Sequence, residues 1–106
     1  MTSDVELSRS LMIMHPQDNV AVCLRALGEG EEIRVTQGEK TLSVKVLEAI
    51  PLGHKVALSS IARGQAIIKY GEQIGRASAA IGCGEHVHLH NVEGTRGRGD
   101  LAGAAR

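Results

Sequence analysis

One short pattern occurs three times along this chain and restricts its possible folds more than any other sequence feature. Each copy has small residues at its first and fourth positions, then Leu or Ile, a glycine three positions later, Glu or Gln, and finally Ile or Val. Glycine suits a turn that needs a positive φ angle, and the Leu or Ile can anchor that turn in a core. We therefore predict three equivalent tight corners between strands. The copies are Cys23–Ile33, Ala57–Ile67 and Ala77–Val87, with Leu27, Ile61 and Ile81 as buried anchors and Gly30, Gly64 and Gly84 as turn residues.

Alternation of apolar and polar residues predicts that the segments between the corners are strands. The clearest example is a hairpin in which Glu31–Thr36 pairs with Lys40–Ala49, with Gly38 in the connecting turn. The corner copies are unequally spaced along the chain, which argues against a solenoid of regular repeats. The expected fold class is therefore mainly β: a single small domain of short strands with tight glycine corners.

Two strands are expected before this hairpin. The apolar run Leu11–Met14 ends at His15-Pro16, where the proline stops the first strand. Asp18 then precedes a second apolar segment, and an aspartate in this position can cap a helix. The alternation within Val20–Leu24 favours a strand instead.

The composition indicates an aliphatic core and no strongly charged partner. The chain has no Phe or Trp and one Tyr, so aliphatic residues and Met must form the core, and we expect modest stability. Lys plus Arg balance Asp plus Glu at twelve each, so the sequence has no excess of positive charge that would indicate binding to nucleic acid or an anionic membrane. A net charge near zero favours association, either with a larger partner or as a homo-oligomer. Cys23 and Cys83 lie in apolar surroundings, so we expect two buried free thiols and a cytoplasmic location.

The two ends of the chain differ from its middle. Residues 1–10 are polar and without pattern, so we expect a flexible lead-in, and they lack the basic and apolar regions of a secretory signal. Residues 95–106 are basic, rich in glycine and without a core face, and we expect a tail that is disordered alone or ordered on a partner. The predicted domain therefore covers residues 11–94. No apolar stretch approaches the roughly 20 residues of a membrane-spanning helix.

The segment Glu85–Asn91, with the sequence EHVHLHN, contains the strongest chemical signal. In a strand, its three histidines would share one face while Val87 and Leu89 point into the core. Such histidines can converge on a metal ion or an anion, and His54 or Glu85 could supply a further ligand. A solvated polar strand face is the alternative interpretation. The predicted metal ligands are His86, His88 and His90.

Two turns could add cationic groups to this histidine face. Gly53-His54-Lys55 follows a turn set by a proline, and Lys69-Tyr70-Gly71-Glu72 ends a later predicted strand. Lysines at strand ends are ordinarily solvated, so neither turn is diagnostic alone. Together with the histidines they would form a cluster rich in hydrogen-bond donors, suited to a carboxylate, a sulfonate or an enediolate. The chain contains no glycine-rich phosphate loop, Cys-x-x-Cys zinc pair, nucleophile elbow or kinase signature.

Five segments taken together carry a family resemblance: Asp18-Asn19-Val20-Ala21, Ile50–Ala57, Ile68–Glu72, Ile74-Gly75 and Gly84–Asn91. They resemble the N-terminal SAF-type domain of the altronate/galactarate dehydratase family, and the His-Lys and His-x-His-x-His-Asn blocks make the resemblance specific. It covers roughly residues 11–100. The family includes the sulfolactate sulfo-lyases, in which this domain is a separate small subunit.

The resemblance implies a β-clip fold, in which short strands fold over themselves. It also implies a lyase that removes water or sulfite from a hydroxy acid with a divalent metal, typically iron(II), which the partner subunit could hold for the most part. The large catalytic domain of that family is missing from this chain. On this basis the predicted catalytic residues are His54, Lys55 and His88, and the predicted substrate-binding residues are Lys69, Tyr70 and Asn91.

Two classes of function remain open. The first is the small subunit of a two-component hydro-lyase or sulfo-lyase for a sugar acid or another hydroxy acid, inactive alone. A base would remove the proton beside the carboxylate, a metal would stabilise the enediolate, and the leaving group would depart from the β-carbon. The second is a non-catalytic binding or assembly module, because a fold alone does not determine a function.

Overall fold

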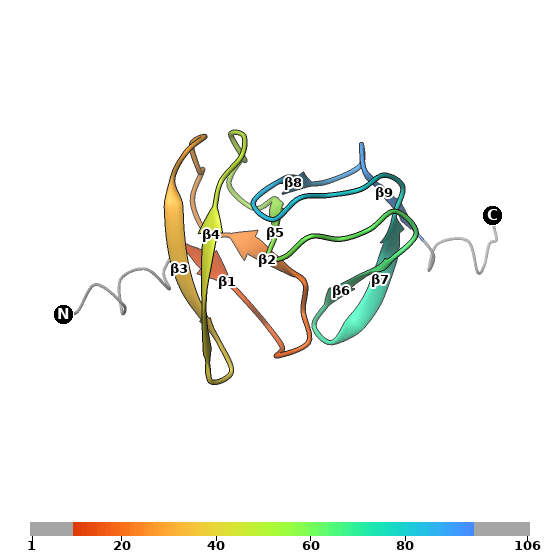
Figure 1. Cartoon of the computed structure of the whole chain (residues 1–106), viewed down its shortest axis with the longest axis horizontal. Helices are drawn as coiled ribbons and strands as arrows, with labels where there is room; N and C mark the ends of the chain where they lie inside the picture. Colours follow the sequence, from red (N-terminus) through yellow and green to blue (C-terminus); the bar gives the residue numbers. More distant parts are fainter. Residues whose placement is uncertain (1–9, 95–106) are drawn as a thin grey trace.

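The computed structural model of the chain describes residues 10–94, which form an all-β domain (Figure 1). These residues contain no helix, and so none that could cross a membrane. The expected mainly β fold is confirmed. The predictions for the lead-in and the tail concern residues that, apart from Ser10, lie outside the described range. The strands are β1 (Leu11–Met12), β2 (Val20–Cys23), β3 (Glu32–Gln37), β4 (Lys40–Lys45), β5 (Lys55–Ala57), β6 (Ala66–Lys69), β7 (Glu72–Ala77), β8 (His86–Val87) and β9 (Val92–Gly94).

The strands form three antiparallel groups along the long axis of the molecule (Figure 1). β3 and β4 make a hairpin at one end, and β6, β7 and β9 make a three-stranded sheet at the other. A four-stranded sheet in the order β1-β2-β5-β8 lies between them. Because β5 pairs with β8, the residues that flank these two strands lie close together although they are far apart in sequence.

The hairpin prediction is confirmed with small changes in its limits. A two-residue turn joins β3 to β4, and Gly38 in that turn has a φ angle of 61°. β4 ends at Lys45 rather than at Ala49. The reason is that Val46 already belongs to the next corner, where its N–H donates a hydrogen bond to the Glu31 carbonyl.

The two expected strands before the hairpin are present, and Asp18 is not a helix cap. The segment after Asp18 is the strand β2, as the alternation predicted, whereas β1 covers only Leu11–Met12. The Asp18 side chain is buried and accepts hydrogen bonds from the backbone N–H groups of Met14, at 3.1 Å, and Gly71, at 2.8 Å. It thereby connects the first loop to the distant turn between β6 and β7.

The three predicted corners are confirmed, and the structure contains a fourth. In each corner, a glycine with a φ angle between 86° and 91° occupies the third position of a four-residue turn, as in a type II turn. The fourth corner, at residues 46–56, fits the pattern except that Val46 stands at its first position and His54 stands where the other copies have Glu or Gln. The four anchors are buried, with at most 3% of their surface exposed: Leu27, Ile50, Ile61 and Ile81.

The corners pack in two reciprocal pairs, and each pair encloses one half of the core. In the first pair, Leu27 and Ile50 exchange backbone hydrogen bonds of 2.9 and 3.0 Å. In the second, Ile61 and Ile81 exchange two bonds of 2.8 Å. The first pair packs with residues of β3 and β4, and the second pair packs with residues of β6 and β7. Each half of the domain is therefore built as corner, hairpin, corner.

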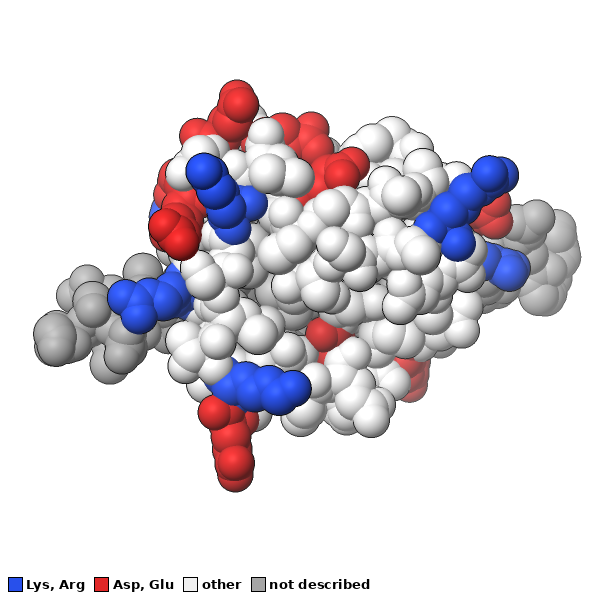
Figure 2. Space-filling model, in the orientation of Figure 1, with Lys and Arg blue, Asp and Glu red and all other residues white. Residues whose placement is uncertain are grey.

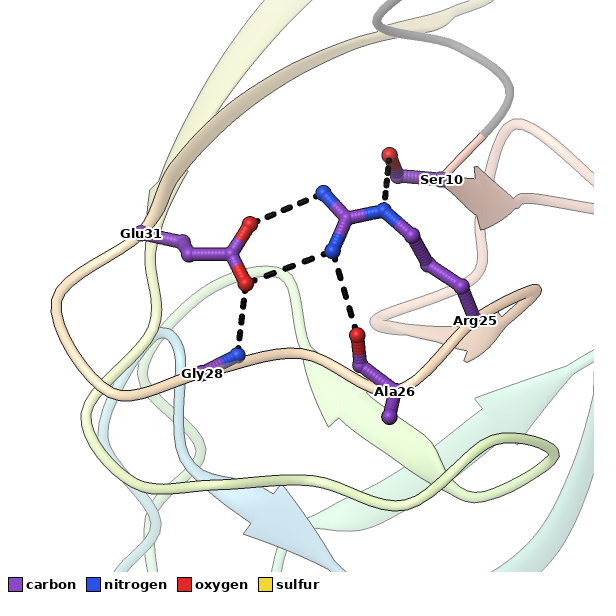
Figure 3. Close-up of polar contacts among 5 residues, drawn as sticks. All are labelled: Ser10, Arg25, Ala26, Gly28 and Glu31. Atoms are coloured by element: carbon purple, nitrogen blue, oxygen red, sulfur yellow. Dashed lines mark hydrogen bonds and ion pairs between the residues drawn. The ribbon is translucent and has the colours of Figure 1, made fainter.

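A side-chain hydrogen bond closes three of the four corners. Glu31, Gln65 and Glu85 each accept a hydrogen bond from the backbone N–H three residues earlier, at 2.6 to 2.8 Å. At the first corner, Arg25 donates two hydrogen bonds to Glu31 and one to Ser10 (Figure 3). Arg25 also lowers the pKa of Glu31. Both partners of this ion pair are well exposed, so the pair itself stabilises the fold little.

Charged side chains lie mainly around the margins of the face that Figure 2 shows. Acidic side chains gather near the loops of the first corner pair, whereas the middle of this face carries few charges. The Lys and Arg side chains visible there are dispersed. Among the described residues that this view shows, therefore, no basic patch of the kind that binds nucleic acid is formed.

Both cysteines are free thiols. Cys23 is fully buried, as expected, and desolvation raises its pKa to about 11. Cys83 is only partly buried, because it lies in the exposed part of a corner, where its Sγ donates to the Leu58 carbonyl at 3.4 Å. Desolvation raises the pKa of Cys83 as well. Neither thiol is activated for chemistry near neutral pH.

Candidate functional site

The histidine-rich segment does not continue as a strand beyond Val87. β8 ends there, and the chain turns over residues 88–91, where the Asn91 N–H donates to the His88 carbonyl at 3.1 Å. Leu89 lies in this turn with 83% of its surface exposed. The prediction that Leu89 points into the core is therefore wrong, because the turn interrupts the strand alternation. Val87 is fully buried, as expected.

Three imidazoles nevertheless converge where β5 and β8 meet. One nitrogen from each of His54, His86 and His88 lies within 4.8 Å of the others, and these three residues form the histidine cluster. His54 Nδ1 and His86 Nε2 share a hydrogen bond of 2.9 Å, and the His54 ring stacks on His88 with centroids 4.1 Å apart. The His90 ring lies beside the cluster, with its centroid 5.2 Å from that of His86. Two of the predicted ligands, His86 and His88, thus converge with His54.

The fourth corner explains why the His54 ring is available to the cluster. In the other three corners, the equivalent Glu or Gln side chain is bound to the N–H at the first position of the turn. In this corner that position is Pro51, which has no N–H to donate. The turn is closed by the backbone alone, with the His54 N–H donating to the Pro51 carbonyl at 3.1 Å. The imidazole of His54 is therefore free to contact His86 and His88.

Two side chains hold the backbone of the histidine segment. Asn91 is only 4% exposed; its Oδ1 accepts from the His88 N–H at 3.0 Å, and its Nδ2 donates to the His86 carbonyl at 2.9 Å. Glu48 Oε2 accepts from the His86 N–H at 3.2 Å. Sequence reasoning missed Glu48, and no local signal marks it, because only the fold brings it to His86. Direct substrate binding by Asn91 stays a prediction, since its observed contacts are with this backbone.

The surroundings of the cluster disfavour positive charge on two of its imidazoles, those of His86 and His88. Desolvation lowers the pKa of His86, and the neighbouring imidazoles lower it further, although the Glu48 carboxylate acts in the opposite direction. Desolvation, together with the charges of His54 and Lys55, lowers the pKa of His88. A neutral imidazole is the form that binds a metal ion or accepts a proton. His86 and His88 are therefore suited to either task near neutral pH.

A hollow of about 240 Å³ adjoins the cluster, and its walls are largely apolar. Lys55 is partly buried at this hollow, where desolvation and the positive charge of Lys69 lower its pKa. A cationic side chain and an imidazole beside apolar walls suit a carboxylate or sulfonate group. The lining residues are Lys55, Ile74, His88, Leu89, Val92 and Gly94.

The predicted substrate-binding residues Lys69 and Tyr70 lie at the turn between β6 and β7. Tyr70, with a φ angle of 59°, and Gly71, with 74°, form a two-residue turn with the backbone signs of type I′. Lys69 Nζ lies 5.1 Å from the centroid of the Tyr70 ring, which is exposed. Lys69 is near enough for its positive charge to lower the pKa of Lys55. Tyr70 lies in the turn whose next residue, Gly71, donates its N–H to Asp18.

The histidine cluster has the donor atoms of a metal site. Three imidazole nitrogens with one open position are the ligand set of some catalytic zinc sites, and imidazole also suits iron. Metal–nitrogen bonds of 2.0–2.1 Å place tetrahedral ligand atoms roughly 3.4 Å apart. The hydrogen-bonded nitrogens of His54 and His86 are 2.9 Å apart, and the ligand nitrogens of the three residues all lie within 4.8 Å of one another, so small side-chain movements would reach that spacing. The donor set therefore fits a divalent cation once the His54–His86 hydrogen bond is released.

Comparisons with known proteins agree with this reading of the fold. Residues 9–95 match the family model described as the altronate/galactarate dehydratase SAF domain. The altronate dehydratase of Bacillus subtilis (strain 168) is 41% identical over 85 residues, which are 80% of this chain and 16% of that protein. The altronate dehydratase of Escherichia coli (strain K12) is 49% identical over 79 residues, 74% of this chain and 15% of that protein. The chain thus spans about a sixth of the length of these two relatives.

A shorter relative is similar over most of its own length. The (2R)-sulfolactate sulfo-lyase subunit alpha of Chromohalobacter salexigens is 45% identical over 62 residues, which are 58% of this chain and 66% of that protein. The similarity to all three relatives is therefore a similarity to one domain, found within long dehydratases and in a short lyase subunit. The chain belongs to the altronate/galactarate dehydratase SAF domain family.

Proposed function

We propose that this chain is the small subunit of a two-component lyase that removes water or sulfite from a hydroxy acid. The observation that carries the proposal is the open site: His88 and Lys55 line a surface hollow, and His54 and His86 converge with His88. A domain of this size cannot both bury a core and enclose a substrate away from water. A large catalytic subunit would complete and cover the site, so the chain alone is inactive. The relative named as a subunit alpha supports this arrangement.

In the proposed complex, His54, Lys55 and His88 are the catalytic residues. The lowered pKa values of His88 and Lys55 suit removal of the proton beside the substrate carboxylate. The His54–His86 hydrogen bond lets a proton on one imidazole be shared with the next. Lys69 and Tyr70 are proposed to bind the substrate from the turn between β6 and β7, with Lys69 adding positive charge for its anionic groups.

We also propose that the histidine cluster binds or shares a divalent metal, with iron(II) as the expected ion from the family resemblance. His54, His86 and His88 would hold it, and His90 would supply a further ligand or contact from beside His86. An imidazole nitrogen bound to a metal cannot also accept a proton, so Lys55 would be the base in the metal-bound site. The metal would stabilise the negative charge of the enediolate as a Lewis acid. The remaining ligands would come from the large subunit.

A non-catalytic assembly module is the second candidate, and the coverage of the relatives favours it. The chain corresponds to only 15–16% of each altronate dehydratase, so most of those proteins lies elsewhere. In this case the histidine cluster would take no part in turnover. For either candidate, the free thiols of Cys23 and Cys83 fit the proposed cytoplasmic location, where disulfides are rare.

The experiment that separates these candidates compares the chain alone with the chain in a complex. The chain is co-expressed with a large-subunit homologue of the altronate dehydratase catalytic region from the same genome, and altronate, galactarate and sulfolactate are supplied as substrates. We expect co-purification, turnover by the complex, and none by the 106-residue chain. Turnover by the large subunit alone at the rate of the complex would favour the assembly module. Turnover by the isolated chain would contradict both candidates.

A further inference from the structure

We propose that Asn91 and Glu48 are positioning residues that set the geometry of the histidine cluster by binding the free backbone edge of β8. The functional weight of this inference rests on the proposed function, because only an active cluster needs a defined geometry. In this role neither residue needs to touch the substrate or a metal. Both would act through the backbone of His86 and His88.

β8 is an edge strand, since it pairs with β5 and no other strand of the described residues. On its paired side, the Glu85 carbonyl accepts a hydrogen bond from Ala57. The backbone groups of His86 are bound by side chains instead. The His86 N–H donates a hydrogen bond to Glu48 Oε2 at 3.2 Å, and the His86 carbonyl accepts one from Asn91 Nδ2 at 2.9 Å. An edge left open would allow the short strand to fray or to pair with another chain.

Asn91 connects the two histidines that the β8 segment contributes. Its Oδ1 accepts from the His88 N–H at 3.0 Å while its Nδ2 reaches the His86 carbonyl, so one rigid amide fixes both backbones. The side chain is 4% exposed, and both of its polar groups are already used. This arrangement engages the amide oxygen and one of the two Nδ2–H donors with the backbone of the two histidines.

The corners provide an internal comparison for this role. Gln65 accepts a hydrogen bond from the Ala62 N–H three residues earlier, at 2.8 Å, just as Asn91 accepts from the His88 N–H. Gln65 closes a corner that contains no histidine, whereas Asn91 closes the turn that carries His88 and also binds His86. Gln65→Ala therefore removes the same kind of turn-closing bond without disturbing the cluster, and it is the matched control.

The first measurement uses nuclear Overhauser effects between imidazole ring protons in the full-length chain. The stacked rings of His54 and His88, with centroids 4.1 Å apart, predict a strong cross-peak. We expect Asn91→Ala and Glu48→Ala to weaken or abolish it, and Gln65→Ala to retain it. Glu48→Gln should also retain it, because the amide oxygen can still accept the His86 N–H. Asn91→Asp, which keeps the acceptor for His88 but loses the donor to His86, should be intermediate.

The second measurement is cobalt(II) binding by the same full-length variants, followed by the visible absorption of the ion. Loss of a group that orients metal ligands typically costs about 10–100-fold in affinity. We expect a weakening of that order for Asn91→Ala and Glu48→Ala, and less than a twofold change for Gln65→Ala. Asn91→Asp and Glu48→Gln guard against the outcome that an alanine variant fails to fold.

The two measurements fail in different ways. If the wild-type chain does not bind cobalt(II), the self-sufficient metal site is wrong, yet the ring cross-peaks still decide the positioning role. If Asn91→Ala and Glu48→Ala keep the His54–His88 cross-peak of Gln65→Ala, the positioning inference is overturned, whatever the metal affinity. If the wild-type chain binds cobalt(II), and Asn91→Ala and Glu48→Ala bind it with the same affinity as the wild type, the inference is overturned in the same way.

Discussion

The four corner glycines have nearly the same backbone conformation but different surroundings, which allows a matched test of the fold. Gly30 and Gly64, with φ angles of 91° and 86°, have no atom within 4 Å of the position that an added Cβ would occupy. At Gly84, with a φ angle of 89°, the added Cβ would collide with the Lys45 carbonyl. Gly84 also accepts a hydrogen bond from the Leu47 N–H at 2.9 Å, so the second corner pair presses here against the first half of the domain.

The expected magnitudes follow from these surroundings. At Gly30 or Gly64, alanine meets only the penalty of a positive φ angle, about 1–2 kcal/mol, partly offset because alanine restricts the unfolded chain. At Gly84 the collision adds an overpacking cost of about 1–3 kcal/mol, and the obstacle is backbone that cannot rotate away. We therefore expect Gly84→Ala to lower the free energy of unfolding by roughly 2–4 kcal/mol, against roughly 1 kcal/mol for Gly64→Ala.

The assay is urea unfolding followed by far-ultraviolet circular dichroism, because the chain has no Trp and Tyr70 is exposed. The denaturant dependence should be the same in all variants, so that midpoints report stability. Equal destabilisation by Gly84→Ala and Gly64→Ala would refute the packing of the second corner pair against Lys45. A severe effect at Gly30 or Gly64 would refute the open surroundings of those corners.

Two further predictions concern the core. Ile61→Ala should lower the free energy of unfolding by roughly 2–5 kcal/mol, because it empties a buried anchor of the second corner pair; a near-neutral result in the same urea assay would show that this anchor is dispensable. The pKa of the Cys23 thiol is raised to about 11 from 9.0, so the native state holds its proton after the unfolded chain has lost it. Stability should therefore fall by about 2 kcal/mol as the pH rises from 9 to 11. Cys23→Ala should lack this component, and parallel stability curves for the two proteins would contradict the assignment.

Local signals were enough to predict the hairpin, the two strands before it and three corners. The glycine with its flanking Leu or Ile is a turn whose cause lies within a few residues, so Leu27, Ile61 and Ile81 could be identified as equivalent anchors. The fourth corner was missed because His54 and Pro51 replace the residues that close the other turns with a side chain. The two replacements are related, because Pro51 has no N–H for a Glu or Gln side chain at position 54 to bind.

The histidine segment shows where alternation alone is a poor guide. Its strand ends at Val87 because Asn91 closes a turn on His88, and Leu89 is left exposed. The spacing could have revealed this, because Asn91 follows His88 by three positions, as Gln65 follows Ala62. The sequence could name His54 as a candidate partner of this segment, but it could not place the two together.

Long-range pairings set the rest of the site, and no local pattern contains them. Glu48 reaches the backbone of His86 only because β5 and β8 are neighbours in the middle sheet. The Asp18 carboxylate likewise binds Gly71 across 53 positions of the chain. Such contacts depend on how the two halves of the domain pack, and therefore on the whole fold.

The central claim is that the histidine cluster takes part in turnover within a two-subunit lyase. The most direct test measures turnover of the purified complex that carries His54→Ala or His88→Ala, with His15→Gln as a control histidine outside the cluster and with subunit stoichiometry checked for each variant. Loss of a general acid or base typically lowers the rate by 10²–10⁴-fold. We expect a loss of that order for His54→Ala and His88→Ala in fully assembled complexes, and wild-type turnover for His15→Gln. Full turnover in assembled complexes of both cluster variants would contradict the account.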